Sequence, residues 1–132
     1  MKPKKFTYRF KVETSAIDVL GHVNNVTYLQ WCLEAAEAHW KTKTDAALRE
    51  KYVWVVLNHN ISYKNPSFIG EELEIQTWID SHKGVRSERR YLITRIEDGK
   101  TLVEAKTMWC LLDGNSRRPI KIPDEIANLF FY

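Results

Sequence analysis

A chain of 132 residues that is 44% hydrophobic and 12% aromatic can bury the core of one domain and is too apolar to be disordered. Twenty basic residues against seventeen acidic ones leave a net charge of +3, which is too small to argue for nucleic-acid binding and suits an anionic ligand. The length predicts a single domain over residues 1–132. No apolar run approaches the length of a membrane span, so we expect a soluble protein that is not exported, with the cytoplasm as its compartment.

The cysteines and histidines argue against a disulfide and a metal site. Cys32 and Cys110 stand alone in apolar surroundings, which favours two buried free thiols in a reducing compartment. The four histidines, at positions 22, 39, 59 and 82, lack the close spacing and cysteine company of a zinc site. The sequence therefore predicts no metal site.

The first predicted element is a strand, because apolar and polar residues alternate over 6–13. The next is a helix over 26–41 that is buried on most sides. At 100° per residue its polar side chains, Gln30, Glu34, Glu37 and Lys41, fall in one narrow stripe, and apolar residues occupy most of the remaining circumference. Other elements must therefore wrap around this helix.

The loop before this helix carries the chemical interest. Gly21 allows a sharp turn, and Asn24 or Asn25 can cap the helix by accepting a hydrogen bond from a free backbone N–H. Asp18 lies just upstream, so a carboxylate and the free donors of a helix start are expected close together. This combination suits acyl transfer or hydrolysis. The alternative is that Asp18 and both asparagines serve only as turn and cap residues.

Four more strands follow a polar stretch, 41–51, in which we expect a short exposed helix or turn. Odd positions of 53–63 are apolar or aromatic, apart from His59, so this strand is predicted to turn Leu57, His59 and Ile61 inward. The other strands are predicted over 72–80, 85–96 and 101–112, the last two joined at Asp98-Gly99, and a helix over 124–131. This order predicts an α+β domain with a five-stranded antiparallel sheet wrapped around one long central helix.

The loop and helix together resemble a known family. The segment Asp18-Val-Leu-Gly-His-Val-Asn-Asn-Val-Thr-Tyr28 is similar to the Asp-x-x-Gly-His-Val-Asn-Asn-x-x-Tyr motif of hotdog-fold thioesterases of the 4-hydroxybenzoyl-CoA thioesterase type and of related fatty acyl-ACP thioesterases. Weaker similarity is found in Glu34-Ala-Ala, in Tyr63-x-x-Pro66 with Gly70-Glu-Glu-Leu73, and in residues 118–123. The resemblance covers nearly the whole chain. It implies a hotdog fold, a homodimer or dimer of dimers with sites between subunits, and no cofactor.

The resemblance also implies roles for individual residues. Asp18 matches the catalytic aspartate, acting as nucleophile or as the base that activates water, and the backbone N–H of Asn25 matches the donor that polarises the thioester carbonyl. His22 matches a histidine of the plant acyl-ACP enzymes. The chain departs from the family pattern at Ala16, where many members have a second Asp, and at Leu20, where the plant enzymes have a catalytic Asn.

Substrate contacts are predicted around the loop and on the sheet. Gly21, Tyr28, Trp31 and His59 are assigned to substrate binding, although His59 also fits a satisfied core histidine. Tyr28, Trp31 and Cys32 are expected to bracket the acyl chain together with Leu57, His59 and Ile61. A cluster of basic residues, with Arg86 and Arg89 as the assigned contacts, is expected to bind coenzyme A phosphates or to be merely solvated; its members are Lys83, Arg86, Arg89 and Arg90.

Three functions follow from this sequence. The leading one is hydrolysis of an acyl-CoA or acyl-ACP thioester to a free acid and a thiol. The second is hydration or dehydration of an acyl thioester, which requires a histidine and a carboxylate in opposed positions. The third is a non-catalytic acyl-thioester binding protein, because a fold does not fix a function.

Overall fold

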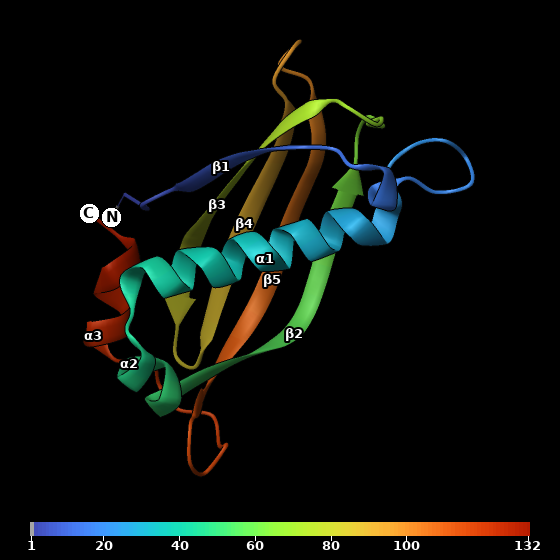
Figure 1. The fold of residues 1–132 in the computed structure, drawn as a ribbon. Coiled ribbons are helices and arrows are strands. Elements are labelled where there is room, and N and C mark those ends of the chain that lie inside the picture. The colour runs from blue at the N-terminus through green and yellow to red at the C-terminus, as the bar shows by residue number, and fades with distance from the viewer. Residues whose placement is uncertain (1) are drawn as a thin grey trace.

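The computed structural model describes residues 2–132 and consists of one sheet crossed by one long helix (Figure 1). The strand order is β1-β3-β4-β5-β2, and every neighbouring pair is antiparallel. The predicted α+β architecture, a five-stranded antiparallel sheet around a long helix, is confirmed. The helices and strands are β1 (Phe6–Lys11), α1 (Asn25–Lys43), α2 (Ala46–Lys51), β2 (Tyr52–Tyr63), β3 (Glu72–Lys83), β4 (Arg86–Arg95), β5 (Thr101–Asp113) and α3 (Asp124–Ala127).

Helix α1 lies against the sheet through small side chains. Cys32 and Ala35 are completely buried, and Ala36 is nearly so, which lets the helix approach the strands closely. The strands meet it with alternate residues such as Leu73, Ile75 and Ile93, which belong to the same buried cluster. Both cysteines are buried and unpaired, as predicted. Burial raises the pKa of the Cys32 thiol to about 12, so this thiol is inert at neutral pH.

Strand β2 contains a bulge that corrects one prediction. The register against β5 shifts between Val56 and Asn58, so the inward face changes from even to odd positions within the strand. His59 and Ile61 face α1 as predicted, but Leu57 is 45% exposed and does not. Ahead of the bulge the even residues Trp54 and Val56 face inward instead.

The far end of α1 is enclosed by segments from both ends of the chain. Pro3 pairs with Phe131, and the N–H of Lys4 donates to the carbonyl of Phe130 over 2.8 Å. The predicted helix over 124–131 is instead α3 followed by a 3-10 turn, η2 (Asn128–Phe130). In Figure 1 both termini lie beside the C-terminal end of α1, opposite the loop that precedes this helix. Among residues 2–132, no helix has the length and apolarity required to cross a membrane.

Candidate active site

The loop over residues 17–24 forms a tight turn around the carboxylate of Asp18. A single bridge between Ile17 and Val23 closes its base, and the N–H of Asp18 donates to the carbonyl of His22 over 2.9 Å. Gly21 has a φ of 87°, which favours glycine, and its N–H donates to the Asp18 carbonyl over 3.1 Å. The assignment of Gly21 to substrate contact stays a prediction, since these bonds give it a role in shaping the turn.

The Asp18 side chain is held from both sides. Its Oδ1 accepts a hydrogen bond of 2.8 Å from the N–H of Leu20, and its Oδ2 lies 3.7 Å from Nδ1 of His22. Nδ1 of His22 also lies 3.2 Å from the carbonyl oxygen of Val23, which can only accept, so this nitrogen is the protonated one. The Asp18 side chain is 19% exposed and that of His22 is 32% exposed. Both groups are therefore fixed in place yet open to solvent.

The start of α1 offers free donors beside this turn. Asn24, not Asn25, is the cap, since its Oδ1 accepts a hydrogen bond of 2.8 Å from the N–H of Val26. Asn25 is the first helical residue, so its N–H has no acceptor within the helix. The hydroxyl of Tyr63 donates to the carbonyl of Asn25 over 3.2 Å and ties the helix start to the end of β2.

Tyr28, Trp31 and His59 have structural contacts. The hydroxyls of Tyr28 and Ser67 are 2.7 Å apart, and the ring of Trp31 lies edge-on to Phe10 at 4.7 Å between centroids. Nδ1 of His59 is 2.8 Å from Oγ1 of Thr107, and burial lowers the pKa of this histidine. These contacts hold the helix against β1 and fasten β2 to β5, so a role for these side chains in substrate binding stays a prediction.

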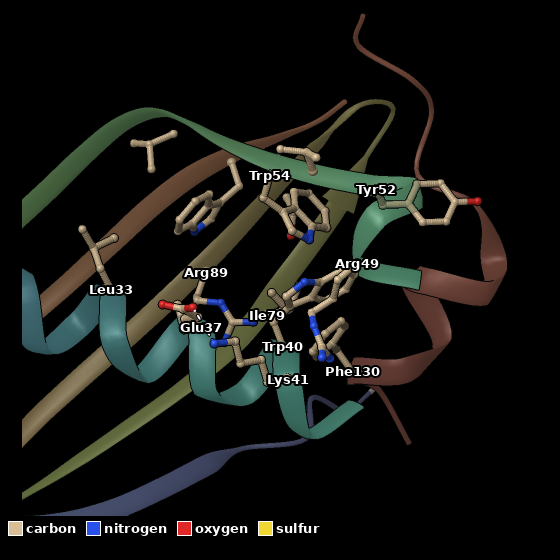
Figure 2. Close-up of a pocket in the computed structure, with 15 residues that line it drawn as sticks. Leu33, Glu37, Trp40, Lys41, Arg49, Tyr52, Trp54, Ile79, Arg89 and Phe130 are labelled. Carbon is tan, nitrogen blue, oxygen red and sulfur yellow. Dashed lines mark ion pairs between the residues drawn. The ribbon is translucent and has the colours of Figure 1, made fainter. Parts of the chain in front are cut away.

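The main apolar cavity lies elsewhere, under the C-terminal half of α1 (Figure 2). Its volume is about 430 Å³. Leu33, eight positions after Asn25, is the first residue of α1 that lines it, so the cavity begins about 12 Å along the helix from the loop over residues 17–24. Arg89 alone among the predicted substrate contacts lines it; the aromatic walls, which the sequence did not single out, are Trp40, Tyr52, Trp54, Trp109 and Phe130.

Arg89 does not belong to an exposed basic cluster, contrary to the prediction. It is 4% exposed, whereas Arg86 is exposed. Side chains alternate along a strand, so these two residues, three positions apart, lie on opposite faces of β4. Arg90, also on the outer face, pairs with Glu88 at 3.0 Å. The alternation of β4 could have predicted this burial, because Arg89 stands at an odd position of the strand, as do the buried residues Tyr91 and Ile93.

Comparison with known proteins assigns this chain to a family. Residues 3–130 match the model of the acyl-ACP thioesterase N-terminal domain. The chain belongs to this family. In addition, no group of three or more potential metal ligands occurs within residues 2–132.

Curated relatives of this chain occur in plants and bacteria. It is 25% identical over 114 residues to the chloroplastic acyl-[acyl-carrier-protein] hydrolase FATB3 of Cuphea viscosissima, covering 86% of this chain and 28% of that protein. It is 25% identical over 126 residues to the long-chain acyl-CoA thioesterase FadM of Escherichia coli, covering 89% of this chain and 91% of FadM. The chain thus spans under a third of the plant relative and most of the bacterial one.

Solved structures show the same hotdog fold. Slr0204, a 1,4-dihydroxy-2-naphthoyl-CoA thioesterase from Synechocystis, superposes with a TM-score of 0.84 at 21% identity, over 96% of this chain and 95% of that one. The probable thioesterase YbaW from Escherichia coli gives 0.83 at 23% identity, over 93% and 94%. At these identities the likeness establishes the fold.

Proposed function

We propose that this domain hydrolyses an acyl thioester of coenzyme A or of acyl carrier protein, with Asp18 as the reactive carboxylate. The observation that carries the proposal is the match to the thioesterase domain over residues 3–130, combined with a fixed, accessible carboxylate at the start of a long helix. The relatives named above are hydrolases of acyl-ACP and of long-chain acyl-CoA. The proposed reaction needs no metal or cofactor.

In the proposed mechanism the thioester carbonyl lies at the start of α1. The N–H of Asn25 donates to the carbonyl oxygen, which becomes negative in the tetrahedral intermediate, and the positive end of the helix dipole favours that charge. Asp18 attacks the carbonyl carbon to give an anhydride that water then cleaves, or it takes a proton from the attacking water. In either route the thiolate leaves and is protonated, by solvent in the first route and by the proton that Asp18 has taken up in the second. Nδ1 of His22, which carries its own proton, lies 3.7 Å from Asp18 and favours the carboxylate form of that side chain.

A substrate panel tests the proposal and its alternatives. Saturated acyl-CoA and acyl-ACP thioesters of graded length are expected to release free thiol, measured with a thiol reagent. Enoyl thioesters are expected to release thiol without first gaining water, because Asp18 and His22 lie in one turn and do not oppose each other across a substrate. Release of no thiol, with tight binding of the same thioesters, would contradict hydrolysis and establish a binding protein.

We further propose that this domain acts in the cytoplasm and forms at least a homodimer through β2. This strand is an edge of the sheet, and an unpaired edge invites pairing. It exposes the apolar side chains of Val55 and Leu57. Light scattering after gel filtration is expected to give twice the 15.6 kDa chain mass or more, and Leu57→Lys to give monomers. An active wild-type monomer at micromolar concentration would refute the dimer.

A further inference from the structure

The cavity under α1 contains a buried cation among aromatic walls (Figure 2). Arg89 is 4% exposed, and its Cζ lies 5.7 Å from the ring centroid of Phe130. Burial lowers the pKa of Arg89 to about 10, so the guanidinium stays protonated at neutral pH. A charge removed from water is costly unless an opposite charge compensates it, so the partners of this group decide what the cavity is suited to hold.

The protein partners of Arg89 are all neutral. Its guanidinium nitrogen donates to Nδ1 of His39 over 2.9 Å and to Oγ1 of Thr77 over 3.1 Å. Because arginine has no acceptor, Nδ1 of His39 must be the unprotonated nitrogen. Burial, assisted by Arg89 itself, lowers the pKa of His39 to about 3. None of the ion pairs formed within residues 2–132 includes Arg89.

A second polar group in the same cavity lacks a partner. Ser87 lies two residues before Arg89 on the same face of β4, lines the cavity and is 1% exposed. Within residues 2–132 its Oγ has no hydrogen-bond partner. Buried hydroxyls are almost always paired, with protein, water or ligand. An uncompensated cation and an unpaired hydroxyl therefore lie side by side in one apolar cavity.

The charges around the cavity favour an anion. Besides Arg89, the charged residues that line it are Lys41, Arg49 and Glu37. Glu37 is already neutralised by Lys41 at 2.8 Å, and Arg49 donates to the backbone carbonyl of Thr44 over 2.6 Å. Three cations against one paired carboxylate give the lining a net positive charge. A volume of about 430 Å³ lies in the range of small-molecule sites.

We propose that this cavity binds an apolar chain that carries a carboxylate, which pairs with the guanidinium of Arg89 and accepts a hydrogen bond from the Ser87 hydroxyl. A carboxylate matches the planar fork of arginine. The phosphates of coenzyme A fit worse, because they would bring several charges between aromatic walls to meet one guanidinium. The carboxylate is either the remote end of a dicarboxylic acyl thioester, a form that rests on the proposed function, or the head of a free fatty acid.

Tryptophan fluorescence tests the binding directly, since Trp40, Trp54 and Trp109 line the cavity. Dodecanoate is expected to bind the wild type at least about tenfold more tightly than dodecanol, the gain of a charged hydrogen bond. Arg89→Met is expected to remove that preference and keep dodecanol binding. Arg9→Met, which removes an exposed arginine of β1, is the control and should keep the preference.

Three results would overturn the inference. They are equal binding of dodecanoate and dodecanol by the wild type, an undiminished preference in Arg89→Met, or free coenzyme A that competes with dodecanoate in an Arg89-dependent way. Ser87→Ala removes one hydroxyl without charge or strain, so it decides the question should Arg89→Met fail to fold. It is expected to weaken dodecanoate binding several-fold and leave dodecanol binding unchanged; equal effects on both ligands would count against the inference.

Hydrolysis then separates the two sources of the carboxylate. If the substrate supplies it, dicarboxylic acyl-CoA thioesters of graded length are hydrolysed faster than their monocarboxylic counterparts, and Arg89→Met reverses that order. If a free fatty acid supplies it, the two series are hydrolysed alike and dodecanoate inhibits only proteins that retain Arg89. If no thioester is hydrolysed, the proposed function fails, while the fluorescence result still decides whether the cavity binds a carboxylate.

Discussion

The two ends of helix α1 are built in different ways. At its start, Asp18 is fixed by residues within four positions of it, through the N–H of Leu20 and the ring of His22. At its other end, the cavity draws on distant segments, and Arg89 reaches His39 fifty residues away. The proposed reactive group is thus positioned by contacts within one turn, and the proposed binding cavity by contacts between segments far apart in the sequence. Each end is therefore expected to respond to substitution in its own way.

The largest expected effect is at the helix start. Asp18→Asn keeps the shape of the turn and an acceptor for the N–H of Leu20, but an amide neither attacks nor accepts a proton usefully. The rate of thioester hydrolysis should fall about a hundred- to ten-thousand-fold, with unchanged thermal stability. Asp45→Asn, at the cap of α2, is the matched control and should keep full activity. Retention of more than a tenth of the rate would shift the catalytic assignment to His22.

The next largest effect concerns His39, beside the cavity, and changes how the free energy of unfolding depends on pH. His39 is buried with a pKa of about 3, below the ordinary 6.5, so the unfolded chain binds more protons between these values. The stability that neutral, buried His39 contributes to the folded state is fully present above pH 6.5 and is lost as the pH falls towards 3. His39→Gln keeps an acceptor for Arg89 but does not titrate. Between pH 7 and 4.5 the wild type should lose roughly 2 kcal/mol more than this variant in urea unfolding.

The other buried histidine, His82, does not affect the difference in stability between the wild type and His39→Gln. Burial also lowers the pKa of His82, to about 4, which acts with the same sign in both proteins and cancels. Parallel losses of stability in the wild type and His39→Gln would show that His39 is not held neutral by its surroundings, and would weaken the account of the Arg89 site.

A third substitution tests whether the cavity selects the acyl chain. Val56 lines it from β2, so Val56→Trp fills space that a long chain would use. The preference for long over short acyl thioesters should fall by about tenfold or more, measured as the ratio of kcat/KM values. Leu92→Trp, on the outer face of β4, is the control. Unchanged selectivity in Val56→Trp would mean that this cavity does not bind the acyl chain, and Tyr28 and Trp31 would then be the residues to test.

The smallest effect concerns the helix cap. Asn24→Ala removes the acceptor of the Val26 N–H, which should lower the free energy of unfolding by about 1 kcal/mol. Asn24→Asp retains an acceptor and should remain close to the wild type. Thermal melts of the two variants provide the measurement. A loss of activity far beyond the loss of stability would mean that the cap also holds the donors of the oxyanion site.

Most of the fold was predictable because its signals are periodic. Alternation predicted the strands, and Asp98-Gly99 predicted the β4–β5 hairpin. The narrow polar stripe of α1 predicted burial on most sides, whereas the helix buries one face and leaves Val26 63% exposed. The bulge at Leu57 was not predictable, because the apolar run from Val53 to Leu57 satisfies either register. Only the pairing with β5 decides which side chains face the helix.

The two parts of the candidate site also differed in how far the sequence could predict them. The turn around Asp18 could be read from neighbouring residues, including its likeness to a family motif. The cavity could not, since its walls meet only after folding. Its neighbours in the sequence make Arg89 look like one of several exposed charges. In the structure Arg89 is buried, and its hydrogen-bond partners, His39 and Thr77, lie on other elements. No local pattern reports such partners.

The place of Phe130 has a consequence for the order of assembly during synthesis. Its ring contacts His39 at 5.0 Å and Trp40 at 6.1 Å between centroids, so contacts about ninety positions apart complete the wall of the cavity. The turn at Asp18 needs only residues 17–24 to close. A nascent chain can therefore close the turn at Asp18 early, but the pocket beneath α1 remains unfinished until residue 130 has left the ribosome.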